Sequence, residues 1–310
     1  MGESGRVPGG DFEVRRHPVV EGLRALRPHQ WAKNLLVFVP LALTPGRVGE
    51  PALQLGALAA FVAFSLVASA GYLVNDLLDL EADRRHPEKC KRPFASGALG
   101  ARIGVGLAIA LVLGAVVLVA AVLPGSFAGV LGTYLVLTLV YSAYLKRFLM
   151  LDVILLAGLY TLRLIGGAVA VTIGLTPWLL AFALFIFLSL AFAKRYSELH
   201  MLAARREVQA ERRAYRVEDL DLVAALGASS GYMSVLVLCL YINSEAVRGP
   251  YHTVELLWFL CPILLYWISR IWFLAKRGEL PGDPVAFAIR DPASWLSGGL
   301  MGVVFVLAIS

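Results

Sequence analysis

Residues 53–83, LQLGALAAFVAFSLVASAGYLVNDLLDLEAD, join a long apolar run to an acidic motif, NDLLDLEAD at residues 75–83. The apolar run is long enough to span a membrane as a helix, and carboxylates at its end are costly to bury unless they have a use. On a helix, Asp76, Asp79 and Asp83 are spaced i, i+3 and i+7, which places them on one face beside Asn75. Neighbouring carboxylates repel one another, so this pattern predicts a bound divalent cation such as Mg²⁺. The alternative is a solvated acidic helix end.

The composition is that of an integral membrane protein, because 59% of the 310 residues are hydrophobic and only 16% are charged. Soluble domains carry about 25% charged residues. The long apolar runs predict an all-α fold, since a membrane barrel needs short alternating strands that the sequence lacks. About nine transmembrane helices are expected, at residues 35–44, 51–80, 103–122, 127–145, 151–173, 177–196, 220–242, 254–274 and 292–309. Residues 1–18 are expected to form a disordered cytosolic tail, and residues 19–310 a single transmembrane catalytic domain.

The distribution of cations predicts the orientation of the chain. Lys and Arg are concentrated in every second connection between the predicted helices, whereas the alternate connections contain only Arg47 and Arg248. Because cytosolic loops hold the excess of cations, the N-terminus and the acidic motif are expected on the cytosolic side. This arrangement, with contacts to anionic membrane lipids, accounts for the net charge of +6, so no nucleic acid partner is expected. The sequence leaves the oligomeric state open, a homo-oligomer included.

Cations follow the acidic motif directly, at Arg84, Lys89 and Arg92. A metal ion on the carboxylates and cationic donors beside it are together suited to bind a diphosphate group. The alternative for Arg84 is the general excess of cations in cytosolic loops.

Further polar residues interrupt the predicted helices. Asp152 and Arg163 are ionisable residues within one predicted span, which makes a functional site the first hypothesis and mutual pairing the alternative. They are about three helical turns apart, too far for a direct pair on one helix. Lys194 and Arg195 end a later span, and cations at that depth could hold a second anion. The turn at residues 282–284 is expected only at the rim of a cavity.

The acidic motif resembles the first motif, NDxxDxxxD, of the UbiA superfamily of intramembrane prenyltransferases, which implies a UbiA-like helical bundle. Members of that superfamily bind a prenyl diphosphate through Mg²⁺, held by this motif and by a second motif, DxxxD. In the region of the fourth and fifth helices that second motif is missing, since Leu156 takes the place of its second aspartate if Asp152 is the first. This departure argues against an enzyme that uses a prenyl diphosphate donor and an aromatic or glycerol-phosphate acceptor, which remains the alternative function. A transporter with carboxylates that carry protons or cations is a further alternative.

Five separate segments resemble one branch of that superfamily, the decaprenyl-phosphate phosphoribosyltransferases: RPHQWAKNLLVFVPL at 27–41, DRRHPEKCKRPFASG at 83–97, YSAYLKRFLMLDV at 141–153, LAFAKRYSEL at 190–199 and DPVAFAIRD at 283–291. The resemblance implies transfer of 5-phosphoribose from phosphoribosyl diphosphate to a polyprenyl (decaprenyl) phosphate, with release of diphosphate. It places this reaction in the synthesis of a precursor of cell-wall arabinan. It also implies a Mg²⁺-dependent glycosyltransferase in the plasma membrane, with its active site facing the cytosol.

The resemblance assigns roles to individual residues. Asp76, Asp79 and Asp83 are the expected catalytic residues and, together with Asn75, the expected Mg²⁺ ligands. The acceptor phosphate is already ionised near neutral pH, so no strong general base is expected, and orientation takes its place. The expected substrate-binding residues are Lys33, Asn75, Glu81, Arg84, Lys89, Arg92, Tyr141, Lys146, Asp152, Tyr160, Arg163, Lys194 and Arg195.

Overall fold

The computed structural model describes residues 18–85, 89–206, 214–247, 251–280 and 282–309. Over these ranges the chain is helical and contains no β-strand, which confirms the all-α prediction. Most of the predicted tail, residues 1–17, lies outside the described residues. Eight apolar stretches of the described chain are long enough to cross a membrane, which confirms a multi-pass membrane protein. They are built on α3 (Pro51–Leu78), α5 (Ala101–Val122), α6 (Gly125–Ala143), α7 (Leu151–Ala170), α8 (Pro177–Ala204), α9 (Leu220–Ile242), α10 (Leu260–Lys276) and α12 (Pro292–Ile309).

The remaining predicted span, residues 35–44, is not a full-length helix. It forms the end of a 3₁₀ helix, η1 (Pro28–Phe38), and the short helix α2 (Val39–Ala42). The other short elements are α1 (Pro18–Leu26), η2 (Pro45–Arg47), α4 (Leu80–Arg85), η3 (Lys89–Lys91), η4 (Leu145–Arg147), η5 (Val217–Asp219), η6 (Glu245–Val247), η7 (Val254–Phe259) and α11 (Pro284–Ala288). The helix count is therefore near the predicted nine.

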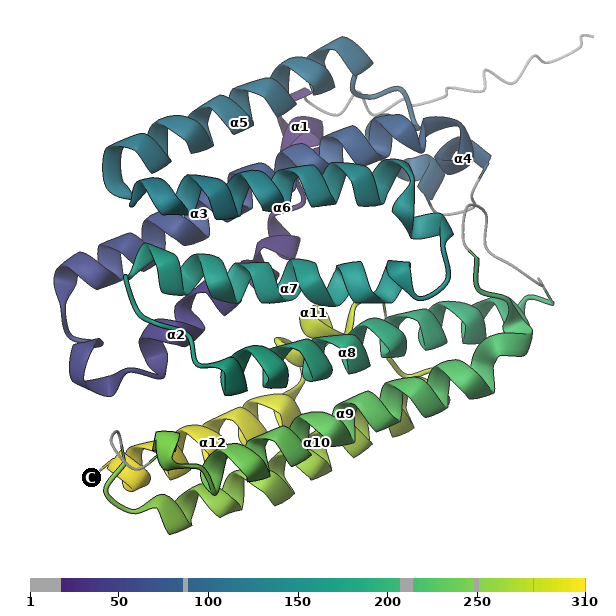
Figure 1. The fold of residues 1–310 in the computed structure, drawn as a ribbon. Helices are drawn as coiled ribbons and strands as arrows, with labels where there is room; N and C mark the ends of the chain where they lie inside the picture. Colours follow the sequence, from purple (N-terminus) through teal and green to yellow (C-terminus); the bar gives the residue numbers. More distant parts are fainter. Residues whose placement is uncertain (1–17, 86–88, 207–213, 248–250, 281, 310) are drawn as a thin grey trace, which may run out of the picture.

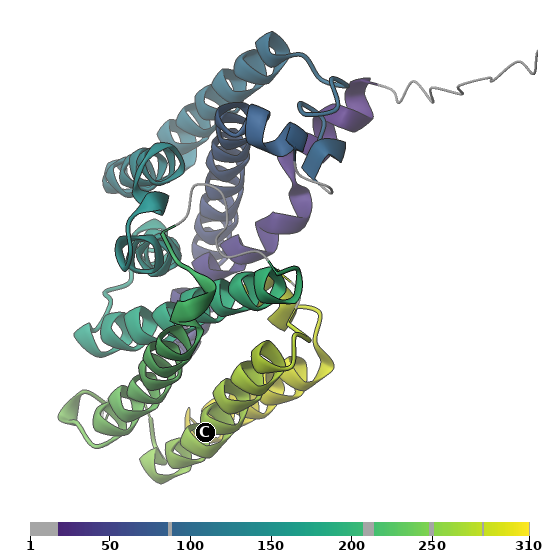
Figure 2. The same ribbon diagram turned by 90° about the vertical axis from the view of Figure 1, so that its right-hand side faces the viewer.

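Successive long helices lie side by side. Figure 1 shows α5, α6, α7 and α8 in chain order across the molecule, with α4, η4 and the C-terminal end of α8 at the same end of the bundle. Figure 2 views the bundle from that end, with α5, α6 and α7 following one another along one side. α3 packs on α5, α6 and α7. This topology brings the acidic motif, at the end of α3, to the same end as the cationic connections.

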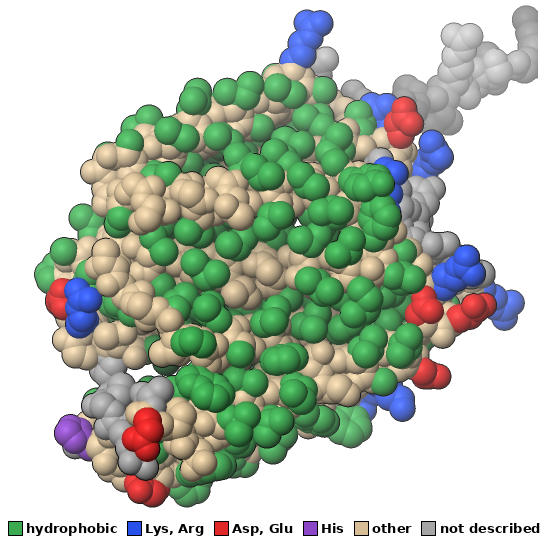
Figure 3. Space-filling model, in the orientation of Figure 1, with side chains coloured by type: hydrophobic (Ala, Val, Ile, Leu, Met, Phe, Trp, Pro, Cys, Tyr) green, Lys and Arg blue, Asp and Glu red, His purple; other side chains and the backbone are tan. Residues whose placement is uncertain are grey.

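The flank of the bundle is apolar. Figure 3 shows hydrophobic side chains across the long helices, while the charged side chains visible on this face gather at the two ends. Large hydrophobic residues on these helices are more than half exposed, among them Ile103, Leu113, Val136 and Val306. A band of this kind matches the hydrocarbon region of a bilayer, where exposed apolar side chains are favourable.

Small residues allow the first helices to approach closely, as they do in many membrane bundles. A Cβ atom at Gly167 of α7 would lie 2.0 Å from the backbone oxygen of Val37, and one at Gly166 would lie 2.4 Å from the ring of Phe64. η1 can therefore pass directly against α7, and α7 against α3; η1 also packs on α3. This contact carries the polar residues of η1 into the interior of the bundle.

Candidate active site

The acidic motif spans the end of α3 and most of α4. α3 ends at Leu78, and Asp79 separates the two helices with φ −97° and ψ 9°. The backbone N–H groups of Asp79 and Asp83 still donate to the carbonyls four residues earlier, at 2.9 and 2.8 Å. The chain therefore turns without losing these helical hydrogen bonds, and Asp76 and Asp83 remain on one side, both buried.

Arg92 lies between two carboxylates of the motif. Its Nη1 atom donates to Asp76 Oδ1 at 3.1 Å and to Asp83 Oδ2 at 2.6 Å. Arg27 also donates to Asp76 Oδ1, at 2.5 Å, and its guanidinium lies over the ring of Tyr72 at 5.3 Å from the centroid. Charge-assisted hydrogen bonds of this kind offset the repulsion between neighbouring carboxylates.

Asp79 has a separate partner. Lys146 of η4 donates from Nζ to Asp79 Oδ2 at 2.7 Å, and its side chain is only 6% exposed. The expectation that the three aspartates share one direction thus fits Asp76 and Asp83, whereas Asp79 is turned toward η4. The sequence predicted binding roles for Lys146 and Arg92, but it gave no role to Arg27. Arg27 lies between α1 and η1 in a left-handed backbone conformation, with φ 52° and ψ 58°. Because it is outside both helices, helical spacing does not predict which residues it contacts.

The other residues predicted near the motif lie outward. Asn75 is half-buried on α3, Arg84 and Lys89 are exposed, and the side chain of Glu81 is 89% exposed and faces Arg85 at 4.0 Å. The described ion pairs of the motif's three aspartates do not include Asn75, Glu81 or Arg84. The substrate-binding roles of these four residues stay predictions.

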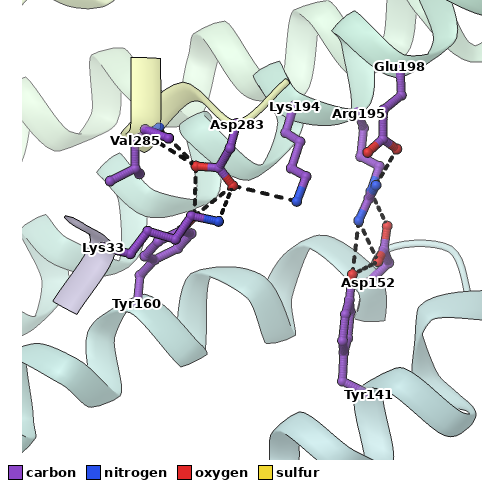
Figure 4. Close-up of polar contacts among 10 residues, drawn as sticks. Lys33, Tyr141, Asp152, Tyr160, Lys194, Arg195, Glu198, Asp283 and Val285 are labelled. Atoms are coloured by element: carbon purple, nitrogen blue, oxygen red, sulfur yellow. Dashed lines mark hydrogen bonds and ion pairs between the residues drawn. The ribbon is translucent and has the colours of Figure 1, made fainter. Parts of the chain in front are cut away.

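A second cluster lies deeper and joins four elements. We call it the lysine cage: Lys33 of η1, Tyr160 of α7, Lys194 of α8 and Asp283, the residue before α11 (Figure 4). Asp283 Oδ2 lies 2.7 Å from Lys33 Nζ and 3.5 Å from Lys194 Nζ. The Tyr160 hydroxyl donates to the Asp283 carboxylate at 3.1 Å. The turn at 282–284, expected at a rim, therefore supplies the central carboxylate.

The two groups at the centre of the lysine cage have shifted pKa values. Burial lowers the pKa of Lys33 to about 8, Asp283 opposes that shift, and the charges of Lys194 and Arg163 add to it. Burial by itself would raise the pKa of Asp283, but the ammonium groups of Lys33 and Lys194 outweigh it and hold that pKa below its ordinary value. Lys33 is therefore a cation that its surroundings destabilise, facing a carboxylate that stays ionised.

Arg163 belongs to a neighbouring network of neutral partners. Its Nε donates to Asn34 Oδ1 at 2.7 Å, and its other nitrogens donate to Leu159 O at 2.6 Å and the Tyr134 hydroxyl at 2.7 Å. The guanidinium also lies 5.4 Å from the ring centroid of Tyr160. Within the described residues, the hydrogen bonds of this buried cation thus go to neutral partners. The suggested pair of Asp152 and Arg163 does not form.

Asp152 instead belongs to a third cluster, which we call the Arg195 cluster: Tyr141, Asp152, Arg195 and Glu198 (Figure 4). Arg195 donates to both carboxylate oxygens of Asp152, one of them at 3.0 Å, and also to Glu198. The Tyr141 hydroxyl donates to Asp152 at 2.8 Å and accepts from Arg195 at 2.9 Å. Asp152 and Arg195 are fully buried and joined across α7 and α8.

The donor set of the acidic motif suits a hard divalent cation, although no cluster of three or more His, Cys, Asp or Glu side chains arranged to hold a metal occurs in the described part of the chain. The carboxylates of Asp76 and Asp83 both accept from one nitrogen of Arg92, so a positive charge already occupies the position between them. Mg²⁺ is commonly held by one or two carboxylates together with substrate phosphates. Asp76 and Asp83 fit that requirement.

The chain is similar in sequence to several bacterial proteins over most of its length. It is 39% identical to the uncharacterized protein y4nM of Sinorhizobium fredii. The match covers 95% of this chain but only 57% of the longer y4nM protein. The chain is 35% identical to the nodulation protein NoeC of Azorhizobium caulinodans, with 94% of each chain covered. Identity to the decaprenyl-phosphate phosphoribosyltransferase of Mycobacterium tuberculosis is also 35%, with 87% of each covered.

Fold comparison agrees with these relatives. A UbiA homolog from Archaeoglobus fulgidus, solved with DMAPP and Mg²⁺, superimposes with a TM-score of 0.70 at 16% identity, covering 93% of this chain and 99% of that one. The sequence model of the UbiA prenyltransferase family matches residues 35–305. The predicted UbiA-like bundle is thereby confirmed, and the chain belongs to the UbiA prenyltransferase family of membrane-embedded transferases.

Proposed function

We propose that this protein transfers a 5-phosphoribosyl group from phosphoribosyl diphosphate to a polyprenyl phosphate and releases diphosphate. Relatives named decaprenyl-phosphate phosphoribosyltransferase, at 32–35% identity, support this donor and acceptor. By the same resemblance, we propose a glycosyltransferase of the plasma membrane with its site on the cytosolic side, in the synthesis of a cell-wall arabinan precursor.

The observation that carries the proposal is the position of the cations around the acidic motif. Arg27, Arg92 and Lys146 come from three separate segments and all contact its aspartates. Cations in this arrangement can move from carboxylate oxygens to the oxygens of a diphosphate, which presents the same acceptor chemistry. The group that leaves in the proposed reaction is a diphosphate, and it needs this stabilisation as its charge develops.

Asp76 and Asp83 would hold Mg²⁺ in this scheme, and the archaeal structural neighbour solved with Mg²⁺ supports the choice of metal. Bound there, the metal would help neutralise the leaving diphosphate. Asp79 and Lys146 would orient the same group from the other side of the motif. We propose Mg²⁺ dependence on this basis.

The chain's own residues have no proton to remove in the proposed reaction. An oxygen of the acceptor phosphate forms a bond to ribose C1 while the bond from C1 to the diphosphate oxygen breaks, and the electron pair leaves with diphosphate. The acceptor oxygen is already anionic near neutral pH. The protein's task is therefore to hold two anionic substrates at the distance and angle of attack, which requires cations rather than a base.

A second candidate function is transfer of a prenyl group from a prenyl diphosphate to an aromatic or glycerol-phosphate acceptor. The structural neighbour solved with DMAPP favours it, because that fold accommodates a prenyl diphosphate. Against it, the second acidic motif is missing, since Leu156 stands four residues after Asp152 and Asp152 is paired with Arg195. Both candidates use the acidic motif, so only the choice of donor separates them.

The test is a transfer assay on purified full-length protein with radiolabelled phosphoribosyl diphosphate and a polyprenyl phosphate, with and without Mg²⁺. We expect label in the lipid fraction only with Mg²⁺. We also expect Asp76→Asn to lower the rate by roughly 100-fold or more, as for loss of a group that stabilises transition-state charge. Asp221→Asn, an exposed carboxylate in the first turn of α9, is the matched control and should leave the rate unchanged. Prenyl transfer without phosphoribosyl transfer would overturn the proposal in favour of the second candidate.

A further inference from the structure

The lysine cage carries more positive than negative charge. Lys33 and Lys194 share the carboxylate of Asp283, and Arg163 stands beside them with the neutral partners Asn34 and Tyr134. In the described residues, Lys33 and Lys194 thus share one carboxylate, and the buried guanidinium of Arg163 lies next to the cage, 5.4 Å from the ring centroid of Tyr160. Buried charges without counter-charges are costly, and an anionic ligand is the usual compensation.

The two oxygens of Asp283 share the Tyr160 hydroxyl, which lies 3.2 Å from Oδ1 and 3.1 Å from Oδ2, but their other partners differ. Oδ1 accepts from the backbone N–H groups of Val285 and Ala286, at 3.1 and 3.3 Å, and so caps α11. Oδ2 faces Lys33 and Lys194. The oxygen that neutralises the lysines is therefore not the one that holds α11 in place.

We infer that the lysine cage is a subsite for a phosphate monoester, and that Asp283 Oδ2 holds the place of a phosphate oxygen while the subsite is empty. A phosphate oxygen there would accept from both ammonium groups and from the Tyr160 hydroxyl, the same donors that Asp283 now uses. A dianion would also balance the surplus of positive charge. Asp283 could keep its cap on α11 through Oδ1 while Oδ2 gives way.

The position of the cage relative to the acidic motif suits this role. Arg27, which binds Asp76, is the residue directly before η1, and Lys33 of the cage lies six residues later on η1. One short segment thus joins the cage to the proposed diphosphate site. The inference rests on the proposed function, in which the donor's 5-phosphate and the acceptor's lipid phosphate are the two monoesters available.

The direction in which Asp283→Asn changes the affinity for a phosphate monoester distinguishes this inference from a structural role for Asp283. Asp283→Asn keeps an oxygen that can cap α11, because asparagine is as good an N-cap as aspartate, but it removes the competing negative charge. Because Asp283 also raises the pKa of Lys33, binding is measured at a pH low enough for Lys33 to keep its proton in the variant. Under that condition a phosphate monoester should bind about tenfold more tightly, the effect of one charge-assisted contact. If Asp283 instead positions the lysines for the ligand, the same variant should bind more weakly.

The experiment measures binding and requires no transfer. Purified full-length protein in EDTA is titrated with ribose 5-phosphate and, separately, with geranyl phosphate, and heats of binding are recorded. Lys194→Met should weaken binding about tenfold, and because the Lys194 side chain is 26% exposed this variant is expected to fold. Lys276→Met, an exposed lysine at the end of α10, is the matched control and should bind like the wild type.

The source of the monoester is identified by the probe, ribose 5-phosphate or geranyl phosphate, that binds more weakly to Lys194→Met and more tightly to Asp283→Asn. This result with either probe, or with both, would support the inference. Unchanged or weaker binding in Asp283→Asn would overturn it, as would binding that ignores Lys194. Because no transfer is measured, failure here leaves the proposed reaction standing. Failure of the transfer assay, in turn, leaves this binding result valid.

Discussion

Replacing Arg195 of α8 by methionine should strongly lower the free energy of unfolding of the protein. Arg195 is 2% exposed, and its guanidinium contacts Asp152, Tyr141 and Glu198. Methionine fills much of the same volume, but it leaves the carboxylate of Asp152, which is 0% exposed, without its cation. Removing one partner of a buried ion pair typically costs about 3–5 kcal/mol, because the remaining charge is desolvated and uncompensated.

The matched variant removes both charges. Arg195→Met combined with Asp152→Leu replaces the pair with apolar side chains, a change that is often neutral in other proteins. Glu198 is 31% exposed and can turn to solvent when its partner is lost. The double variant should therefore recover most of the stability that the single variant loses, a coupling of more than about 2 kcal/mol between the two sites.

Thermal unfolding in detergent measures both variants, and a loss of about 3 kcal/mol should lower the midpoint by roughly 6–12 °C. Additive effects, with the double variant less stable than either single variant, would refute the reasoning. The activity of the double variant then tests the substrate-binding roles predicted for Asp152, Tyr141 and Arg195. A stable but inactive double variant would show that the cluster does more than hold α7 to α8.

Two further predictions concern close packing and pH. Gly167→Ala should cost about 1–3 kcal/mol, since overpacking against a backbone forces a shift. Gly158→Ala, on the same helix with open space around it, should be neutral or stabilising by up to about 1 kcal/mol; equal unfolding midpoints for the two variants would contradict this. Lys33 faces the other lysine-cage residues and Arg163, and its pKa is lowered to about 8. At pH values above about 8 its ammonium group loses the proton, so the KM for the phosphate-bearing substrate should increase. Stability should change in the opposite sense over the same range, rising from pH 8 toward the ordinary lysine pKa of about 10.4, since the unfolded chain keeps the proton longer; a flat KM profile across this range would argue against a role for Lys33 in binding.

The sequence alone determined the class of fold and the family. Apolar runs of about 20 residues permit few structures in a bilayer, because every backbone N–H and C=O group must be paired within the helix itself. Several helices consequently begin at the predicted residues, as at 51, 151, 177 and 292, whereas α8 continues eight residues past its predicted end at 196. The motif NDLLDLEAD predicted an acidic end for α3. The same motif carried the resemblance of the chain to UbiA enzymes.

Only the tertiary structure decided which charges meet. Arg195 binds Asp152 across 43 residues, Arg163 binds Asn34 across 129, and Tyr160 binds Asp283 across 123. Spacing along a helix reports on neighbours within about four residues and carries no information about partners on other helices. Those partners follow from how closely the helices pack, which small residues such as Gly167 permit and which brings η1 and α11 into the bundle. The lysine cage is assembled by that packing from four elements, and no single stretch of the sequence contains it.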